Sequence, residues 1–174
     1  MILPKPLAFL FKDDGRVPNN PVLPALVYKT AIDLRGTANP DAAIEKVFKA
    51  NGWGHNVWRD GIFTYVHYHS MIHEAQGIAR GRARVRLGGD RGEELEFAAG
   101  DVAVLPAGTG HQLRTASEDF LVVGAYPPEG TYDLCRGVNA AERARALTTI
   151  PQVPLPKTDP VTGKDEPLPK LWHR

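Results

Sequence analysis

The chain has 174 residues, a formal net charge of +1 and a single cysteine. This length is typical of one domain with its own hydrophobic core, and the near-zero charge argues against nucleic-acid or membrane-surface partners. Cys135 has no partner for an internal disulfide, which fits a reducing cytoplasm. Ile2–Phe11 is apolar, but Pro4, Lys5 and Pro6 make it a poor signal peptide. No apolar run approaches the roughly 20 residues of a membrane span.

The first sixty residues predict two strands and one helix. Leu7–Phe11 is a candidate for a strand at a sheet edge, and Ala25–Ile32 is a candidate for a second strand. Asn39 fits the N-cap of a helix over Pro40–Asn51, which has proline at its first position. Gly52 is typical of the residue that ends such a helix.

From residue 63 onward the apolar runs are short and are separated by turns, a pattern typical of an all-β sandwich or barrel. A jelly roll closes such strands into a double sheet with a usable interior. The predicted strands are Phe63–His69, Glu74–Arg80, Ala83–Leu87, Glu94–Ala98, Val102–Leu105, His111–Thr115 and Phe120–Ala125.

The C-terminal part predicts a helix and a tail. Asn139–Thr149 reads as a helix with Asn139 as its cap. Pro151–Arg174 is proline-rich, and we expect it to be extended and ordered only if it docks on the barrel or on a partner chain. We therefore divide one domain into residues 1–60 (strands and helix that pack on the barrel), 61–137 (barrel core) and 138–174 (helix and tail).

Two histidines and a glutamate have a spacing that brings them to one side of the barrel. Side chains two positions apart in a strand share a face, so Tyr65, His67 and His69 project together if they lie on a strand. Glu74 and Gln76 share a face in the next strand. Imidazole and carboxylate groups bind divalent metals. Tyr65 and Gln76 are candidates to contact substrate or orient the ligands, or else are satisfied polar core residues.

A second stretch supplies a third imidazole. Val102–Leu105 suits a short strand, Pro106 and Gly108 mark a tight turn, and His111 opens the following strand. The expected site then has three histidines and one carboxylate: His67, His69, Glu74 and His111.

These two stretches resemble the two motifs of the cupin superfamily. The first, G-x5-H-x-H-x4-E-x6-G, is matched by Gly61, His67, His69, Glu74 and Gly81. The second, G-x5-P-x-G-x2-H-x3-N, is matched by Gly100, Pro106, Gly108 and His111, with Thr115 in place of an asparagine that is not a metal ligand in the family. Val122–Gly137 resembles a subfamily of small bacterial cupins that are largely uncharacterised.

The resemblance implies a single jelly-roll barrel (a double-stranded β-helix) with short flanking helices, and one divalent transition metal at its centre. Iron, manganese, nickel and zinc all bind such ligands. The first functional hypothesis is an enzyme acting on a small molecule, a metal-dependent dioxygenase or isomerase. Alternatives are a non-catalytic ligand-binding or sensing module, and a barrel that acts through oligomerisation, with a homodimer expected. A metal-free barrel with the histidines as hydrogen-bonded core residues is a further alternative.

His73 leaves one alternative open. It has the opposite strand parity to Glu74 and should point away from the site. An irregular turn across Ser70–Ile72 could instead bring His73 in and turn Glu74 out, because parity does not fix side-chain direction near a turn.

The remaining patterns favour structural roles. Arg80, Arg82, Arg84 and Arg86 alternate along one expected strand, and Glu94 and Glu96 alternate after a turn at Leu87–Gly92. This favours cross-hairpin ion pairs on a solvated face over an anion site. Trp53, Trp58 and Trp172 are expected in the core or an interface. Cys135 has no histidine near it in sequence to support a nucleophile role.

Overall fold

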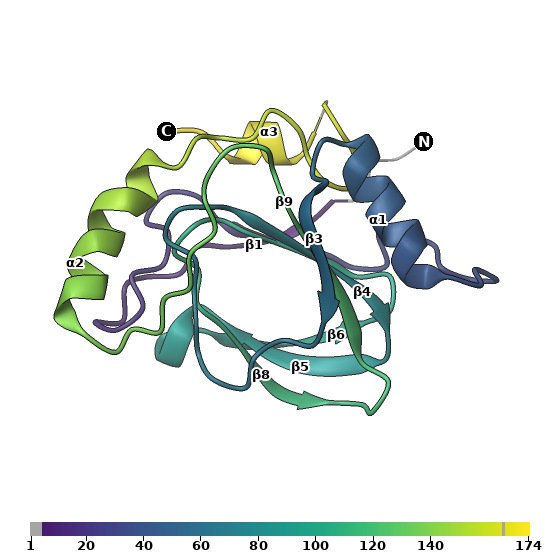
Figure 1. Cartoon of the computed structure of the whole chain (residues 1–174), viewed down its shortest axis with the longest axis horizontal. Coiled ribbons are helices and arrows are strands. Elements are labelled where there is room, and N and C mark those ends of the chain that lie inside the picture. Colours follow the sequence, from purple (N-terminus) through teal and green to yellow (C-terminus); the bar gives the residue numbers. More distant parts are fainter. Residues whose placement is uncertain (1–4, 165) are drawn as a thin grey trace.

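The computed structural model describes residues 5–164 and 166–174 as two antiparallel sheets that face each other (Figure 1). The strands are β1 (Leu7–Phe9), β2 (Ala25–Tyr28), β3 (His55–Asp60), β4 (Glu74–Arg80), β5 (Arg82–Leu87), β6 (Glu93–Ala98), β7 (Val102–Leu105), β8 (His111–Ala116) and β9 (Leu121–Tyr126). The larger sheet has the order β1-β2-β7-β4-β9-β3, and the smaller has the order β6-β5-β8. The start of the apolar segment Ile2–Phe11 lies outside the described residues.

Three short α-helices flank the sheets: α1 (Pro40–Ala50), α2 (Ala140–Thr149) and α3 (Leu168–Leu171), with single 3-10 turns at Gly89–Arg91 and Ile150–Gln152. The Asn139 side chain caps α2 by accepting the N–H of Glu142 at 2.8 Å. Asn39 stands at the N-cap of α1 without a side-chain cap bond. Within the described residues, each helix is too short or too polar to cross a bilayer. The expected all-β jelly roll with short flanking helices is confirmed.

One predicted strand is wrong. Phe63–His69 does not form a strand. Successive residues of this segment form backbone bridges to different parts of the chain, so no continuous pairing with one strand develops. His67 bridges His111, whereas Tyr68 bridges Cys135. The strand in this region is β3, which precedes the segment and pairs with β9. Only two of its six residues are apolar, so the pattern did not reveal it.

Apolar residues fill the space between the two sheets and cover the outer face of the larger sheet. The inner core includes Val27, Ile78, Val85, Phe97 and Val122. The outer core joins the larger sheet to α1 and the tail through Ile44, Phe48, Trp53, Leu168 and Trp172. Gly77 permits this close approach of α1, since a Cβ at that position would lie 2.5 Å from Ile44 Cγ2.

The proline-rich tail docks on the barrel of its own chain. Trp172 is 3% exposed, and its indole Nε1 donates to the carbonyl oxygen of Pro24 at 2.8 Å. The buried Asp159 carboxylate accepts backbone N–H groups from Val161 at 2.7 Å and from Leu168 at 3.1 Å. The expectation of an entirely extended tail is corrected by α3.

The expected arginine row is divided between two strands. Arg80 ends β4, and Gly81 turns the chain with a φ of +75° before β5 begins. Ala83 and Val85 are buried, so the arginines of β5 lie on its outer face. The predicted cross-hairpin pair forms between Arg84 Nη2 and Glu96 Oε1 at 3.3 Å.

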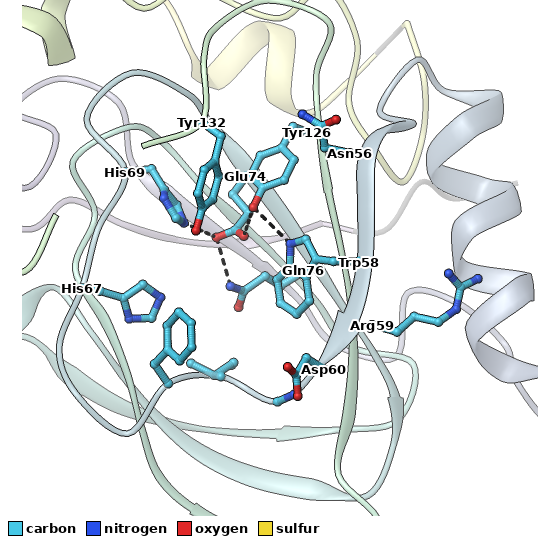
Figure 2. Close-up of a pocket in the computed structure, with 13 residues that line it drawn as sticks. Asn56, Trp58, Arg59, Asp60, His67, His69, Glu74, Gln76, Tyr126 and Tyr132 are labelled. Atoms are coloured by element: carbon cyan, nitrogen blue, oxygen red, sulfur yellow. Dashed lines mark hydrogen bonds and ion pairs between the residues drawn. The ribbon is translucent and has the colours of Figure 1, made fainter. Parts of the chain in front are cut away.

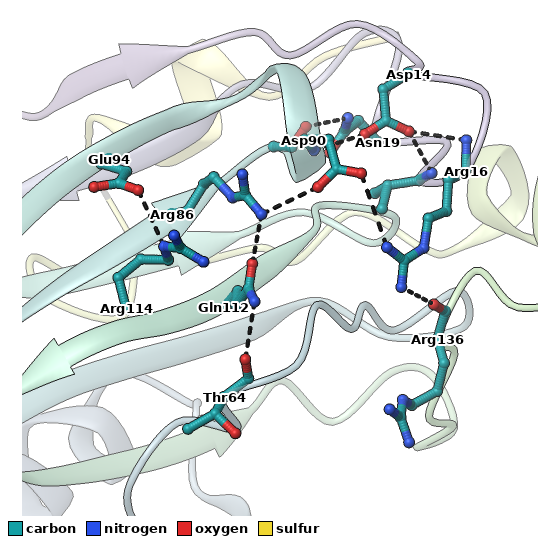
Figure 3. A network of polar contacts seen from close by, with 12 residues as sticks. Asp14, Arg16, Asn19, Thr64, Arg86, Asp90, Glu94, Gln112, Arg114 and Arg136 are labelled. Carbon is teal, nitrogen blue, oxygen red and sulfur yellow. Dashed lines mark hydrogen bonds and ion pairs between the residues drawn. The ribbon is translucent and has the colours of Figure 1, made fainter.

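Arg86 does not pair with Glu94, although the two residues are in register. Its guanidinium donates to Asp90 at 3.0 Å and to Gln112 at 2.7 Å (Figure 3). Glu94 instead accepts from Arg114 on β8 at 3.1 Å. Acidic and basic side chains on this face pair with each other, as the solvated-face interpretation expects.

Candidate metal centre

Three histidines from two separate segments converge between the sheets. His67 and His111 exchange two backbone hydrogen bonds of 3.1 and 2.9 Å, which fixes the extended segment against the start of β8. One ring nitrogen from each of His67, His69 and His111 lies within 4.8 Å of the others. All three side chains are buried. Small movements of the rings would allow all three nitrogens to coordinate a single ion.

The turn before β8 helps to place His69. Gly108 has a φ of +96°, and its N–H donates to the carbonyl oxygen of His69 at 2.7 Å. A Cβ at Gly108 would lie 2.6 Å from the carbonyl oxygen of Asn19. Glycine is therefore required both by the positive φ and by the close backbone contact.

Backbone carbonyl groups set the proton position on all three rings. The Nδ1 partners are the carbonyl oxygens of Tyr65 for His67 (3.2 Å), of Asp133 for His69, and of Thr109 for His111 (3.0 Å). A carbonyl oxygen can only accept, so each Nδ1 carries a proton, and a neutral ring keeps its lone pair on Nε2. Metal-binding histidines are oriented by this kind of bond.

Glu74 faces the same point from β4. Its Oε2 lies 3.4 Å from Nε2 of His69 and 3.4 Å from Nε2 of His111. Gln76 Nε2 donates to Oε2 at 3.0 Å, and the hydroxyl of Tyr126 donates to Oε1 at 3.1 Å (Figure 2). The carboxylate is 2% exposed and is held at both oxygens.

The local charges favour an anionic Glu74 carboxylate and a neutral His67, whereas His69 is protonated more readily than a free imidazole. Burial disfavours the charged form of Glu74, yet His69 and His111 hold the pKa of this carboxyl well below its ordinary value. Burial, reinforced by His111, lowers the pKa of His67 to about 2. Burial also opposes protonation of His69, but the Glu74 carboxylate raises its pKa overall.

One buried nitrogen supports the fit of this donor set to a cation. Nε2 of His111 is buried, and the described residues supply it with no hydrogen-bond partner. Leaving such an acceptor unsatisfied costs about 1–3 kcal/mol. Three imidazole nitrogens and a carboxylate suit divalent zinc, iron, manganese or nickel.

His73 lies on the other side of the chain. Its Nδ1 accepts the backbone N–H of Ala107 at 2.9 Å, and its Nε2 lies 3.1 Å from the carbonyl oxygen of Pro154. Its ring packs against Trp172 with centroids 4.8 Å apart. Burial lowers its pKa to about 3, so the ring is neutral. Of these two adjacent residues, Glu74 is the one that faces the histidine cluster.

A cavity of about 490 Å³ adjoins the cluster. Its lining residues are Asn56, Trp58, Arg59, Asp60, Gly61, Ile62, Phe63, His67, His69, Glu74, Gln76, Tyr126 and Tyr132. Gln76 is among these lining residues, beside the Glu74 carboxylate to which it donates. Tyr65 is absent from the described lining, and its ring stacks on Phe63 with centroids 4.8 Å apart. The guanidinium of Arg136 lies 3.6 Å from the Tyr65 ring centroid.

The aromatic wall was not foreseen from the sequence. The indole of Trp58 lies across Gly124 of β9, where a Cβ would come within 1.9 Å of the ring. Trp58 Nε1 donates to the Tyr126 hydroxyl at 3.1 Å. The sequence held one signal for this wall. In a strand at this position, Gly124 and Tyr126 lie two residues apart and therefore share the face of β9 that begins at Val122.

No protein-family model matches the chain. Over 164 residues, however, it is 42% identical to the uncharacterized protein YjlB of Bacillus subtilis (strain 168). This match covers 94% of this chain and 94% of YjlB. The relationship therefore extends well beyond the two histidine-containing stretches.

Two solved structures have a weak overall similarity to this chain. A mutant of Bacillus subtilis oxalate decarboxylase OxdC is 17% identical with a TM-score of 0.38, over 66% of this chain and 28% of that chain. An uncharacterized conserved protein with a double-stranded β-helix domain from Klebsiella pneumoniae is 15% identical with a TM-score of 0.38, over 76% of this chain and 79% of that chain. Likeness at this level carries no argument about function.

Proposed function

This chain belongs to the YjlB family within the cupin superfamily, and we propose that it binds one divalent transition metal and acts on a small molecule in the adjoining cavity. The proposed ligands are His67, His69, Glu74 and His111. For the reaction we propose oxygenase- or isomerase-type chemistry at a mononuclear site. Iron, manganese, nickel and zinc are all compatible with the donor set.

The observation that carries this proposal is the convergence of three buried imidazole rings, each with a ring nitrogen within 4.8 Å of the other two. Three carbonyl groups hold the Nδ1 protons of these rings. The Nε2 atoms of His69 and His111 face the Glu74 carboxylate. A core that kept its histidines only for hydrogen bonding would satisfy Nε2 of His111, whereas this nitrogen is buried without a partner among the described residues.

The side chains around the cluster have separate roles. A divalent metal supplies a Lewis acid when it is bound. Tyr126 and Gln76 hold the Glu74 carboxylate in place through its two oxygens. Trp58 and Tyr132 form apolar walls of the cavity and exclude water from the substrate.

Metal content tests the binding part of this proposal. Protein purified without chelators should contain close to one equivalent of a divalent transition metal per chain. His69→Ala should lower that content sharply with little loss of fold, because the two apolar cores do not include His69. His173→Ala, which removes an exposed histidine, is the matched control and should keep the metal. Near-full occupancy in His69→Ala would contradict the assignment.

Turnover tests the catalytic part. Metal-loaded protein should convert at least one member of a panel of small phenolic and thiol compounds, followed by oxygen uptake and by product chromatography under air and under nitrogen. Oxygen-dependent loss of substrate supports oxygenase chemistry, and product of unchanged mass supports isomerase chemistry. Stoichiometric metal without turnover would instead favour a binding or sensing module.

A further inference from the structure

The cavity beside the histidine cluster has mainly aromatic and aliphatic walls. Trp58, Ile62, Phe63, Tyr126 and Tyr132 line it. Its volume of about 490 Å³ lies within the range of small-molecule sites, roughly 300–1,000 Å³. An apolar cavity of about 150 Å³ is enough to hold benzene. The space therefore accommodates a molecule of one or two rings.

The aromatic rings of the wall are arranged for contact with another ring. Tyr126 and Tyr132 meet edge to face, with centroids 5.9 Å apart and an interplanar angle of 74°. The Tyr132 ring also lies 5.1 Å from the His69 ring. Trp58 is held by its hydrogen bond to Tyr126 and by its contact with Gly124. Offset-stacked and edge-to-face geometries of this kind stabilise aromatic ligands.

Among the described lining residues, no lysine or arginine side chain is free to bind an anionic ligand. Arg59 is the one lysine or arginine among the described lining residues, and its side chain points toward α1 (Figure 2). Its Nε lies 2.8 Å from Asp41, and its Nη2 bonds to Glu45. The lining also contains the carboxylates of Asp60 and Glu74. A carboxylate or phosphate on the ligand would lose hydration without gaining an arginine or lysine partner.

We propose that the cavity binds a neutral aromatic molecule of one or two rings that carries a hydroxyl group. Its ring packs among Trp58, Phe63 and Tyr132, and its hydroxyl points to the cluster of His67, His69 and His111. This substrate class rests on the proposed function, because the hydroxyl is the group that meets the metal. The geometry disfavours aliphatic dicarboxylates and aromatic acids.

Three probes of matched size test the inference. They are 2-naphthol (neutral and aromatic), 2-naphthoate (anionic and aromatic) and decahydro-2-naphthol (neutral and saturated), each titrated into zinc-loaded protein by calorimetry at neutral pH. We expect 2-naphthol to bind at least tenfold tighter than either of the others. Equal or tighter binding of 2-naphthoate, or of the saturated alcohol, overturns the inference.

The zinc content measured beforehand separates this inference from the proposed function. A folded chain that takes up no zinc contradicts the proposed function. A zinc-loaded chain that prefers 2-naphthoate contradicts only the substrate class. Because the wall and the charge pattern belong to the protein, the same order of the three probes is expected on metal-free protein, and a reversed order there also counts against the inference.

Variants of two exposed aromatic residues of the cavity wall test the aromatic contribution by itself. Phe63 and Tyr132 are 45% and 48% exposed, so their replacement by alanine should leave the fold intact. Each replacement should weaken 2-naphthol binding about three- to tenfold through loss of one aromatic contact. Leu147→Ala on α2 is the control, because Leu147 is 49% exposed and lies outside this cavity. Unchanged affinity in both the Phe63 and the Tyr132 variants would remove the aromatic wall from recognition.

Variants of Asp60 test whether the charge of the cavity lining selects a neutral ligand. Asp60→Lys should raise the affinity for 2-naphthoate at least tenfold and leave that for 2-naphthol within about twofold, because it adds a cation to the lining. Asp60→Asn should produce a smaller change in the same direction. If neither variant improves naphthoate binding, charge does not select the ligand and the neutral class is wrong.

Discussion

The hydroxyl of Tyr126 donates to Oε1 of Glu74 at 3.1 Å. The same hydroxyl accepts from Nε1 of Trp58 at 3.1 Å, which links the cavity wall to the carboxylate. Since Gln76 holds the other oxygen of Glu74, the carboxylate has little freedom to rotate away from the histidines. The wall and the proposed metal site therefore depend on one another.

Removal of the Tyr126 hydroxyl should weaken metal binding. Tyr126→Phe keeps the ring but leaves Oε1 of Glu74 without its donor, and loss of a bond that orients a metal ligand typically costs about tenfold or more in affinity. Competition with a chromogenic chelator measures the zinc dissociation constant. Tyr65→Phe is the control, since Tyr65 is absent from the described cavity lining. Equal zinc affinity in the two variants would show that Tyr126 does not position Glu74.

Gly124→Ala should destabilise the fold by disturbing Trp58. The new Cβ would come within 1.9 Å of the indole, so the ring must shift. Overpacking of this kind costs about 1–3 kcal/mol in the free energy of unfolding, measured by denaturant titration. Gly61→Ala is the matched control, because a Cβ at that position meets nothing within 4 Å. Indistinguishable unfolding curves for the two variants would place Trp58 elsewhere.

The tail should contribute strongly to stability through one side chain. Trp172→Ala removes a buried indole that packs on His73 and bonds to Pro24, and such truncations cost about 3–5 kcal/mol. The neighbouring Leu171 is 36% exposed, so Leu171→Ala should cost far less. Thermal unfolding of both variants measures the difference. Similar losses would mean that the tail is not docked as described.

The thiol of Cys135 should be unreactive in the folded protein. Burial, together with the bond to the Asp133 carboxylate, raises its pKa to about 11. The neutral thiol should resist iodoacetamide at pH 8, whereas the same thiol should react readily in concentrated urea. Mass spectrometry measures the modified fraction, and rapid labelling of the native chain would contradict the burial.

The raised pKa of Cys135 also predicts how the stability of the protein changes with pH. The unfolded thiol ionises above about pH 8.5, while the folded thiol stays neutral until about pH 11. The free energy of unfolding should therefore fall as the pH rises through this interval. Cys135→Ser should show a smaller fall over the same range.

Sequence patterns were most reliable where a segment belongs to one ladder. β4 and β7 have their predicted bounds because each is a continuous run between clear turns. β3 was missed because its two exposed ends and its polar residues hide the pairing with β9. Phe63–His69 was predicted as a strand from alternation alone. In the folded chain, however, successive residues of this segment bond to different backbone partners.

The candidate site was likewise predictable only in part: its four proposed ligands were expected from the sequence, whereas its cavity wall was not. The spacing of His67, His69, Glu74 and His111 within two motifs was enough to expect their convergence. The cavity wall depends on tertiary contacts that no local pattern specifies, such as the packing of Trp58 on Gly124. The parity of His73 correctly placed it away from Glu74, whereas its bonds to Ala107 and Pro154 appear only in the folded chain.

Anomalous diffraction from crystals of protein purified without chelators tests the central claim most directly. The account predicts one strong anomalous peak bounded by Nε2 of His67, His69 and His111 and by Oε2 of Glu74. The peak should be lost in crystals of His111→Ala. Maps without a peak at this point, or with the metal bound elsewhere while the four side chains stay apart, would contradict it.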